Sequence, residues 1–171
     1  YTLEQATTAS DSNPNFLANE ELKAHLKVSD CSQVSDGGAA IILATEAGVK
    51  ALGKKLEDCI EITSYAIATN PLGKVADYTE LDTTAKAAAE AYKDAGLTPD
   101  AVQVCEVHDC FAVTEILMYE ALGFAKKGEG KNLARSGATA ITGKTPVNTG
   151  GGLIAFGHPV GATGIKQVLE V

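Results

Sequence analysis

Short apolar or alternating segments occur along the chain between stretches of helical periodicity. Four segments are predicted to be strands, at residues 39–44, 60–69, 101–107 and 147–154, and the first of them is a continuous apolar run. A short run without polar interruption is typical of a strand buried on both faces of a sheet, and β-branched residues favour a strand over 60–69. The pattern therefore predicts a buried sheet.

Helical periodicity lies between these runs. Apolar residues share one face over 81–95, where Gly96 and Pro99 end the predicted helix. The stretch 111–122 is apolar nearly all round, which is expected of a helix that lies between layers. Strands that alternate with helices predict an α/β layered domain. Shorter helices are predicted around 19–25, over 46–52, near residue 133 and from 163 to 171.

The composition narrows the class of protein. The 171 residues are enough for one domain with a core, and 45% hydrophobic and 21% charged residues are ordinary for a soluble globular chain. A formal charge of -8 argues against a general nucleic-acid surface. We find no transmembrane run and no signal peptide. The chain begins without methionine and stops within a helical pattern, so we expect it to be part of a longer protein.

The four cysteines are Cys31, Cys59, Cys105 and Cys110, and they form neither a Cys-x-x-Cys pair nor a zinc spacing. They are predicted to be reduced thiols of an intracellular protein, the first three of them structural. The triple glycine at 150–152 lacks the spacing of a dinucleotide site, and no P-loop is present.

One histidine lies in a glycine-rich turn. The sequence from Gly150 to Gly164 places His158 after an apolar run and before a predicted helix. Glycines at this density allow backbone conformations closed to other residues and let another group approach closely. Two interpretations stay open on this stretch alone: a functional histidine, or a structural connection whose histidine faces solvent.

A second histidine lies at the end of a predicted strand. Glu106, His108 and Cys110 share one side if the strand stays extended, because side chains alternate with period two. Asp109 then faces away and is placed to cap the helix that follows. A thiol at a helix N-terminus is favoured as a thiolate, and a nearby histidine adds a donor for an oxyanion. The alternative is that Cys110 and His108 are ordinary core residues.

Three motifs together resemble those of the thiolase superfamily. The motif at 157–164, Gly-His-Pro-x-Gly-Ala-Thr-Gly, resembles the family's histidine motif. Residues 107–111, Val-His-Asp-Cys-Phe, look like the motif that sterol-carrier-protein-type thiolases carry where most thiolases have Asn-Glu-Ala-Phe. Residues 29–40 are similar to the opening of the thiolase C-terminal domain. The motifs occur in the family's order, and the resemblance covers residues 16–171.

The resemblance implies a thiolase-like fold of two similar halves, each a five-stranded mixed sheet between helix layers. This chain would contain the end of the loop region, residues 1–26, and the C-terminal thiolase domain, residues 27–171, without its last strands. The implied reaction is acyl transfer to coenzyme A, either thiolysis of a 3-ketoacyl-CoA, as in fatty-acid β-oxidation, or the reverse Claisen condensation. Coenzyme A is then a substrate, and no permanently bound cofactor or metal is implied.

The resemblance also assigns roles to four residues. His158 matches the histidine that activates the family's nucleophilic cysteine and helps to hold the thioester oxygen. His108 matches the position, usually asparagine, that shapes the first oxyanion hole. Cys110 matches the cysteine that takes the second acid/base role in this subgroup. Ser32 aligns with a serine that contacts the pantetheine arm of coenzyme A.

Two departures from the family pattern limit what this chain is expected to do. The nucleophilic cysteine belongs to the other half, and the late glycine motif follows residue 171. We therefore expect the chain alone to be inactive. The resemblance implies an acyl-CoA substrate, no nucleic-acid or membrane partner, and a homo-oligomer (dimer or tetramer) of the full-length protein. It fits a cytoplasmic protein if bacterial and a peroxisomal matrix protein if eukaryotic.

Other functions remain open at this stage. A thiolase-fold carbon–carbon lyase would act on steroid side-chain CoA esters with a partner protein, but such enzymes tend to carry tyrosine in place of the thiolase cysteine, here Cys110. A non-catalytic acyl-CoA-binding module is a third interpretation. A metal site made by His108, Cys110 and His158 is a fourth.

Overall fold

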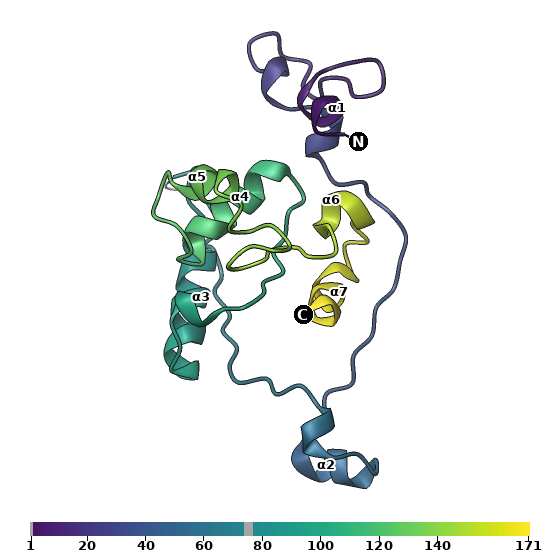
Figure 1. The fold of residues 1–171 in the computed structure, drawn as a ribbon, viewed down its shortest axis with the longest axis vertical. Coiled ribbons are helices and arrows are strands. Elements are labelled where there is room, and N and C mark those ends of the chain that lie inside the picture. Colours follow the sequence, from purple (N-terminus) through teal and green to yellow (C-terminus); the bar gives the residue numbers. More distant parts are fainter. Residues whose placement is uncertain (1, 74–76) are drawn as a thin grey trace.

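The computed structural model describes residues 2–73 and 77–171, and its ordered elements are helical. Figure 1 shows α3, α4 and α5 gathered together, with α6 and α7 beside them, α1 at one end and α2 at the other. The α-helices are α1 (Leu3–Thr7), α2 (Glu46–Ala51), α3 (Asp82–Ala95), α4 (Ala112–Ala121), α5 (Gly130–Arg135), α6 (Gly152–Phe156) and α7 (Thr163–Glu170). The 3₁₀ turns are η1 (Lys23–His25), η2 (Val28–Asp30), η3 (Leu56–Asp58) and η4 (Pro99–Ala101).

Helices with a clear stop residue lie where the sequence predicts them. α3 ends at Gly96, which adopts the left-handed conformation with φ 67° and donates its N–H to the carbonyls of the last turn. α2 begins after Thr45, whose hydroxyl accepts the Gly48 N–H, and Gly53 follows it with φ 66°. The predictions near residue 133, over 111–122 and after 163 are confirmed by α5, α4 and α7.

The N-terminal segment differs from its prediction in two places. The region around 19–25 holds only the 3₁₀ turn η1. Residues 3–7, where the sequence analysis places no helix, form α1 because Thr2 and Gln5 make a reciprocal capping box. The Thr2 hydroxyl accepts the Gln5 N–H at 3.2 Å, and the Gln5 side chain accepts the Thr2 N–H at 2.8 Å.

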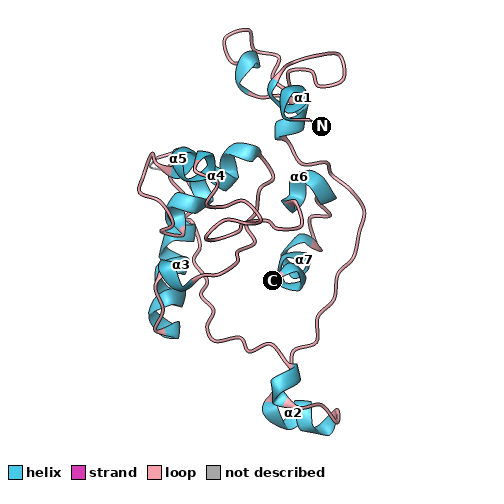
Figure 2. Ribbon diagram, viewed as in Figure 1, coloured by secondary structure: helices cyan, strands magenta, loops and turns pink. Residues whose placement is uncertain are grey.

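The predicted sheet does not form among the described residues. Across 2–73 and 77–171 no segment is a β-strand, and pairing is limited to isolated bridges (Figure 2). Residues 39–44 and 60–69 are extended but unpaired, so the prediction of a strand is wrong for both. The sequence also predicts that the strand at 39–44 is buried on both faces, whereas Ile42 is 85% exposed. An extended segment becomes a strand only when a neighbour takes up its N–H and C=O groups. The five-stranded sheet stays a prediction.

The predicted strand at 147–154 is also wrong over most of its length. Val147 makes a parallel bridge with Cys105, but α6 begins at Gly152. Between them the backbone turns sharply, with φ 52° at Asn148, 97° at Gly151 and 62° at Gly152. Positive φ values interrupt an extended chain, so the apolar residues after Gly152 form a helical turn instead.

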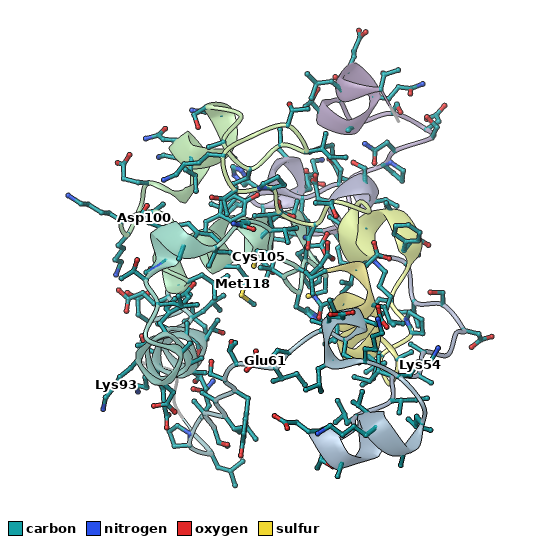
Figure 3. All side chains as sticks on the ribbon, turned by 60° about the horizontal axis from the view of Figure 1, so that its bottom comes forward. Lys54, Glu61, Lys93, Asp100, Cys105 and Met118 are labelled. Atoms are coloured by element: carbon teal, nitrogen blue, oxygen red, sulfur yellow. The ribbon has the colours of Figure 1, made fainter. Side chains whose placement is uncertain are left out.

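The core is small and lies where α4 meets α3, α5 and the two segments that hold Cys105 and Val147. Its buried centre is Val107, Tyr119 and Val147. Figure 3 shows Cys105 and Met118 in this interior, and both pack against the buried centre. The partly buried residues around it are Cys105, Ile116, Met118, Leu122, Phe124, Leu133 and Ala134. The core therefore supports one side of the 105–111 segment.

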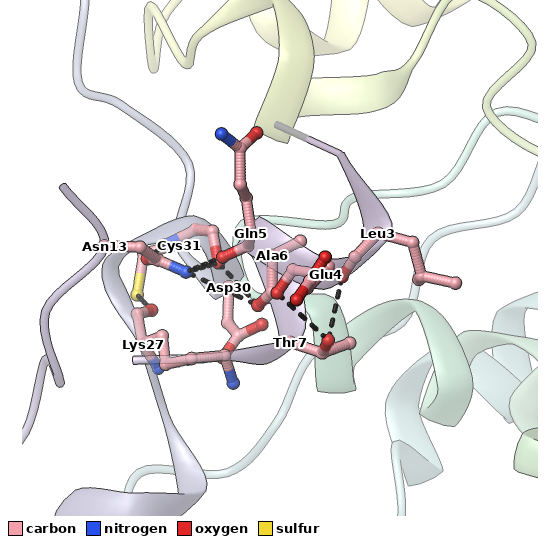
Figure 4. A network of polar contacts seen from close by, with 10 residues as sticks. Leu3, Glu4, Gln5, Ala6, Thr7, Asn13, Lys27, Asp30 and Cys31 are labelled. Carbon is pink, nitrogen blue, oxygen red and sulfur yellow. Dashed lines mark hydrogen bonds and ion pairs between the residues drawn. The ribbon is translucent and has the colours of Figure 1, made fainter. Parts of the chain in front are cut away.

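The N-terminal unit is built around one buried amide (Figure 4). Asn13 is fully buried; its Nδ2 donates to Gln5 O at 2.8 Å and contacts Ser29 Oγ at 2.9 Å, while its Oδ1 accepts the Ser29 N–H at 2.9 Å. The backbone bond from Val28 N to Pro14 O joins residues on the two sides of the predicted boundary, and the bond from Phe16 N to Leu26 O lies just before it. The domain boundary at 26/27 stays a prediction. The network fixes the backbone just before Ser32.

Candidate active site

The segment around His108 keeps the predicted alternation of side chains, although it is not part of a sheet. Val107 is 4% exposed and Asp109 2% exposed, and Cys105 packs against the core with them. Burial raises the pKa of Cys105 to about 11, which favours the protonated thiol. Its structural role stays a prediction. His108 belongs to the opposite set and meets His158.

A buried polar network holds this segment from behind. The Asn148 side chain accepts the Val107 N–H at 2.8 Å and donates to Glu115 Oε2 at 2.8 Å. Tyr119 donates its hydroxyl to Glu115 Oε1. Burial raises the pKa of the Glu115 carboxyl, while these two hydrogen bonds oppose the rise. Asn148 thereby gives a backbone N–H the partner that a neighbouring strand would otherwise supply.

Asp109 caps a different helix from the one predicted. It faces away from His108 as expected, but α4 has no side-chain cap at Phe111. Its Oδ1 instead accepts the Leu153 N–H of α6 at 2.7 Å. A β-carbon on Gly152 would lie 2.2 Å from Asp109 Oδ2, so only glycine allows this approach. The reason is packing: Asp109 points into the interior, where the start of α6 lies. The contact joins the His108 segment to the helix that precedes His158.

His158 is held on both its backbone and its ring. Its N–H donates to Gln33 O at 2.7 Å, and its Nδ1 lies 2.7 Å from Thr163 Oγ1. Gly157 has φ 88°, and a β-carbon there would lie 2.3 Å from Ser35 Oγ. The glycines that the sequence singled out therefore do allow another segment to approach closely, and that segment is 33–35.

The two histidine rings meet edge to face. The ring centroids of His108 and His158 are 4.8 Å apart, with an angle of 84° between the ring planes. Burial lowers the pKa of His108, and the neighbouring His158 lowers it further, against an opposing effect of the Asp109 charge. The lowered pKa favours the neutral imidazole of His108, which still offers one N–H donor.

Residues 31–34 tie the two histidine segments together. Ser32 N donates to Cys110 O at 2.9 Å, and Cys31 pairs with Phe111 in an antiparallel bridge. On the other side Val34 pairs with His158. Cys110 directly precedes Phe111, the N-cap of α4, as expected. The structure thus joins three segments that are far apart in sequence, those of Ser32, of His108 with Cys110, and of His158. The chemical roles of these residues stay predictions.

The carboxyl group of Glu106, to which the sequence analysis assigned no role, lies next to this region. Glu106 Oε1 accepts the Thr149 N–H at 3.0 Å, while Oε2 is buried without a hydrogen bond. Burial raises the pKa of Glu106, and the positive charge of Lys166 opposes the rise. Lys166 lies 3.5 Å from Glu170 Oε1 and 4.3 Å from the centroid of the Phe156 ring. One indication of the cluster of Glu106, Lys166 and Glu170 is present in the sequence: Glu106 lies on the same side of the extended segment as His108.

The described residues meet neither the requirements of a metal site with three or more such ligands nor those of a membrane-spanning helix. Within the described ranges, no group of three or more His, Cys, Asp or Glu side chains is placed to hold a metal ion. None of the helices there combines the length and the apolar character that a bilayer crossing requires.

Comparison with known proteins matches residues 64–171 to the family model described as thiolase C-terminal domain-like. The chain is 44% identical to acetyl-CoA acetyltransferase of Methanothermobacter thermautotrophicus (85% of this chain, 38% of the relative) and 38% identical to human sterol carrier protein 2 (91% and 29%). It is 35% identical to benzoylsuccinyl-CoA thiolase subunit BbsB of Thauera aromatica (84% and 37%). It therefore spans between 29% and 38% of these relatives.

A solved structure shares the fold. The "Ltp2-ChsH2(DUF35) aldolase" aligns with a TM-score of 0.69 over 99% of this chain and 42% of that chain, at 20% sequence identity.

Proposed function

We propose, from the premise that this chain belongs to the thiolase C-terminal domain family, that it is part of an enzyme that transfers acyl groups to coenzyme A. The reaction is thiolysis of a 3-ketoacyl-CoA or the reverse Claisen condensation. The observation that carries the proposal is the edge-to-face pair of His108 and His158, joined through residues 31–34 to Cys110.

His158 acts as the base of the proposed reaction. In thiolysis an enzyme thiol attacks the keto carbon, so its proton must be removed as the new carbon–sulfur bond forms. An imidazole has a pKa near neutrality and suits this transfer. In the second half of the reaction the Cys110 thiolate takes the proton of the incoming coenzyme A thiol, whose sulfur attacks the acyl-enzyme and releases the acyl group as its thioester, and His158 returns its proton to the enzyme sulfur. The enzyme thiol itself is expected in the half of the protein outside this chain.

His108 and Cys110 act on the departing acetyl group. Cleavage of the carbon–carbon bond leaves an enolate of acetyl-CoA, whose negative charge develops on the thioester oxygen. The neutral His108 donates its N–H to that oxygen, and Cys110 protonates the enolate carbon, giving acetyl-CoA and a thiolate. A single oxyanion donor of this kind is typically worth about 10²–10³ in rate.

The exposed apolar side chains of the extended segments indicate that another part of a larger protein covers them. Ile60 is 92% exposed and Ile67 81%, and residues 60–69 run beside no other strand in the described chain. We propose that the rest of the protein covers these apolar side chains and completes the sheet. Because the enzyme thiol also lies there, the chain alone does not turn over substrate. We assign to Ser32, whose N–H donates to Cys110 O, contact with the pantetheine arm of coenzyme A.

The test is a thiolysis assay on the full-length protein with acetoacetyl-CoA and a long-chain 3-ketoacyl-CoA. We expect turnover that falls by at least about 10² in Cys110→Ala, because the enolate loses its proton donor. Cys59→Ala is the matched control, since Cys59 is exposed and lies beside η3, away from the site.

Other results would contradict the proposal in different ways. Wild-type activity in Cys110→Ala would remove Cys110 from the mechanism. Tight coenzyme A binding without turnover by the intact enzyme would favour a binding module. Cleavage of steroid side-chain CoA esters only after a partner protein is added would favour a lyase.

A further inference from the structure

The hydroxyl of Thr163 lies against the inner nitrogen of His158. Thr163 is the first residue of α7 and is 4% exposed, so water does not compete for its side chain. Its Oγ1 is 2.7 Å from His158 Nδ1 and 3.1 Å from Pro159 O. The two contacts have different chemistry, because a carbonyl oxygen only accepts whereas an imidazole nitrogen donates or accepts.

The Thr163 hydroxyl has one proton for its two hydrogen bonds. Pro159 O can only accept, and besides this hydroxyl it accepts the N–H groups of Ala162 and Thr163. When the hydroxyl donates to Pro159 O, only lone pairs remain on Oγ1 for His158, and Nδ1 then carries the ring proton and donates it. The other ring nitrogen, Nε2, is left with its lone pair free. The backbone N–H of His158 is fixed at the same time by Gln33 O at 2.7 Å.

We propose that Thr163 is a positioning residue that holds neutral His158 as the Nδ1–H tautomer and presents Nε2 as the proton acceptor. The catalytic consequence rests on the proposed thiolase function, whereas the tautomer itself does not. Thr163 contributes no charge and, in this role, touches no substrate. It acts through His158 alone, so it should affect proton transfer and leave substrate binding almost unchanged.

The expected size of the effect follows from the strength of one neutral hydrogen bond. Such a bond typically shifts an equilibrium by about fivefold. In Thr163→Val, which keeps the shape but has no hydroxyl, we expect kcat to fall by about fivefold while KM stays within about twofold. Thr163→Ser keeps the hydroxyl and should restore most of kcat.

The direct experiment is nuclear magnetic resonance of the full-length protein with ¹⁵N-labelled histidine, at a pH where His158 is neutral. His158→Gln assigns the signal. The ¹⁵N shifts of wild type and Thr163→Ser are expected to show a proton on Nδ1, and those of Thr163→Val a mixture with the Nε2–H form. A proton on Nε2 in wild type would overturn the inference, as would unchanged shifts and unchanged kcat in Thr163→Val.

The two proposals fail separately in this design. The tautomer is read without substrate, so it holds or fails even if the full-length protein shows no thiolysis. Conversely, thiolysis by a wild-type enzyme with the Nε2–H tautomer would support the proposed function and reject the role of Thr163. If Thr163→Val does not fold, the shifts of wild type and Thr163→Ser still decide the tautomer.

Discussion

Two regions of the molecule contain similar apolar residues but differ in what surrounds them. The first is the pair of segments around His108 and His158, and the second is the pair of extended segments at 39–44 and 60–69. Val107 is 4% exposed and its N–H is taken by Asn148, whereas Ile60 is 92% exposed. In the first region, side chains and loops form hydrogen bonds with the backbone N–H and C=O groups and bury the apolar side chains. In the second region, a similar sequence leaves its apolar side chains exposed. Apolar pattern alone therefore sets where a strand can form, and a neighbour sets whether it does.

The strongest test of this contrast is His158→Ala in the full-length protein. If the packed region carries the chemistry, removing the base should abolish acyl-enzyme formation, with a loss of at least about 10²–10⁴ in rate. Mass spectrometry of the protein after incubation with substrate measures the acylated thiol. His25→Ala, in the solvent-facing turn η1, is the matched control. Normal acylation of the His158 variant would show that the packed region is not the catalytic one.

The second test asks whether the open region is covered in the full-length protein. Ile60→Ala should cost about 2–4 kcal/mol of unfolding free energy there, because it would leave a cavity under the covering strand. Urea denaturation measures the difference, and Lys54→Ala is a control at an exposed charged side chain nearby. A change of less than about 0.5 kcal/mol would mean that residue 60 stays in water.

The smallest expected effect concerns the carboxylate of Asp109, which joins the His108 segment to the helix before His158. The Asp109 charge raises the pKa of His108 against burial and His158. Asp109→Asn keeps an acceptor for the Leu153 N–H but removes the charge, so the pKa of His108 should fall further. His108 would then stay neutral to a lower pH. Titration of the histidine signals in the full-length protein measures this, and a rise of the His108 pKa would contradict it.

Local signals in the sequence predicted the helices well. The stops at Gly53 and Gly96 depend on neighbouring residues only, and both helices end there. The capping box of Thr2 and Gln5 was an equally local signal that the sequence analysis missed. The error at 147–154 has the same origin, because the apolar residues were weighed without the turn that Asn148 and Gly151 impose.

Contacts between distant residues explain what the sequence could not predict at the site. The motifs indicated His158, His108 and Cys110, and the structure brings their segments together. Nothing in the sequence indicates that Asp109 meets Leu153 or that Asn148 meets Val107, since 44 and 41 positions separate the members of each pair. Thr163 is five positions from His158, but only the turn between them brings its hydroxyl to the ring.

The tie made by residues 31–34 also sets an order for folding during synthesis. The bonds within the N-terminal unit, such as Asn13 to Ser29, join residues that leave the ribosome close together. Ser32 must wait for Cys110, and Gln33 for His158, 78 and 125 positions later in the chain. Contacts between residues so far apart in sequence form late, because the entropy of closing a long loop is lost before the contact can stabilise the chain. A nascent chain therefore carries the first half of this tie, already shaped, long before the histidines that it will hold.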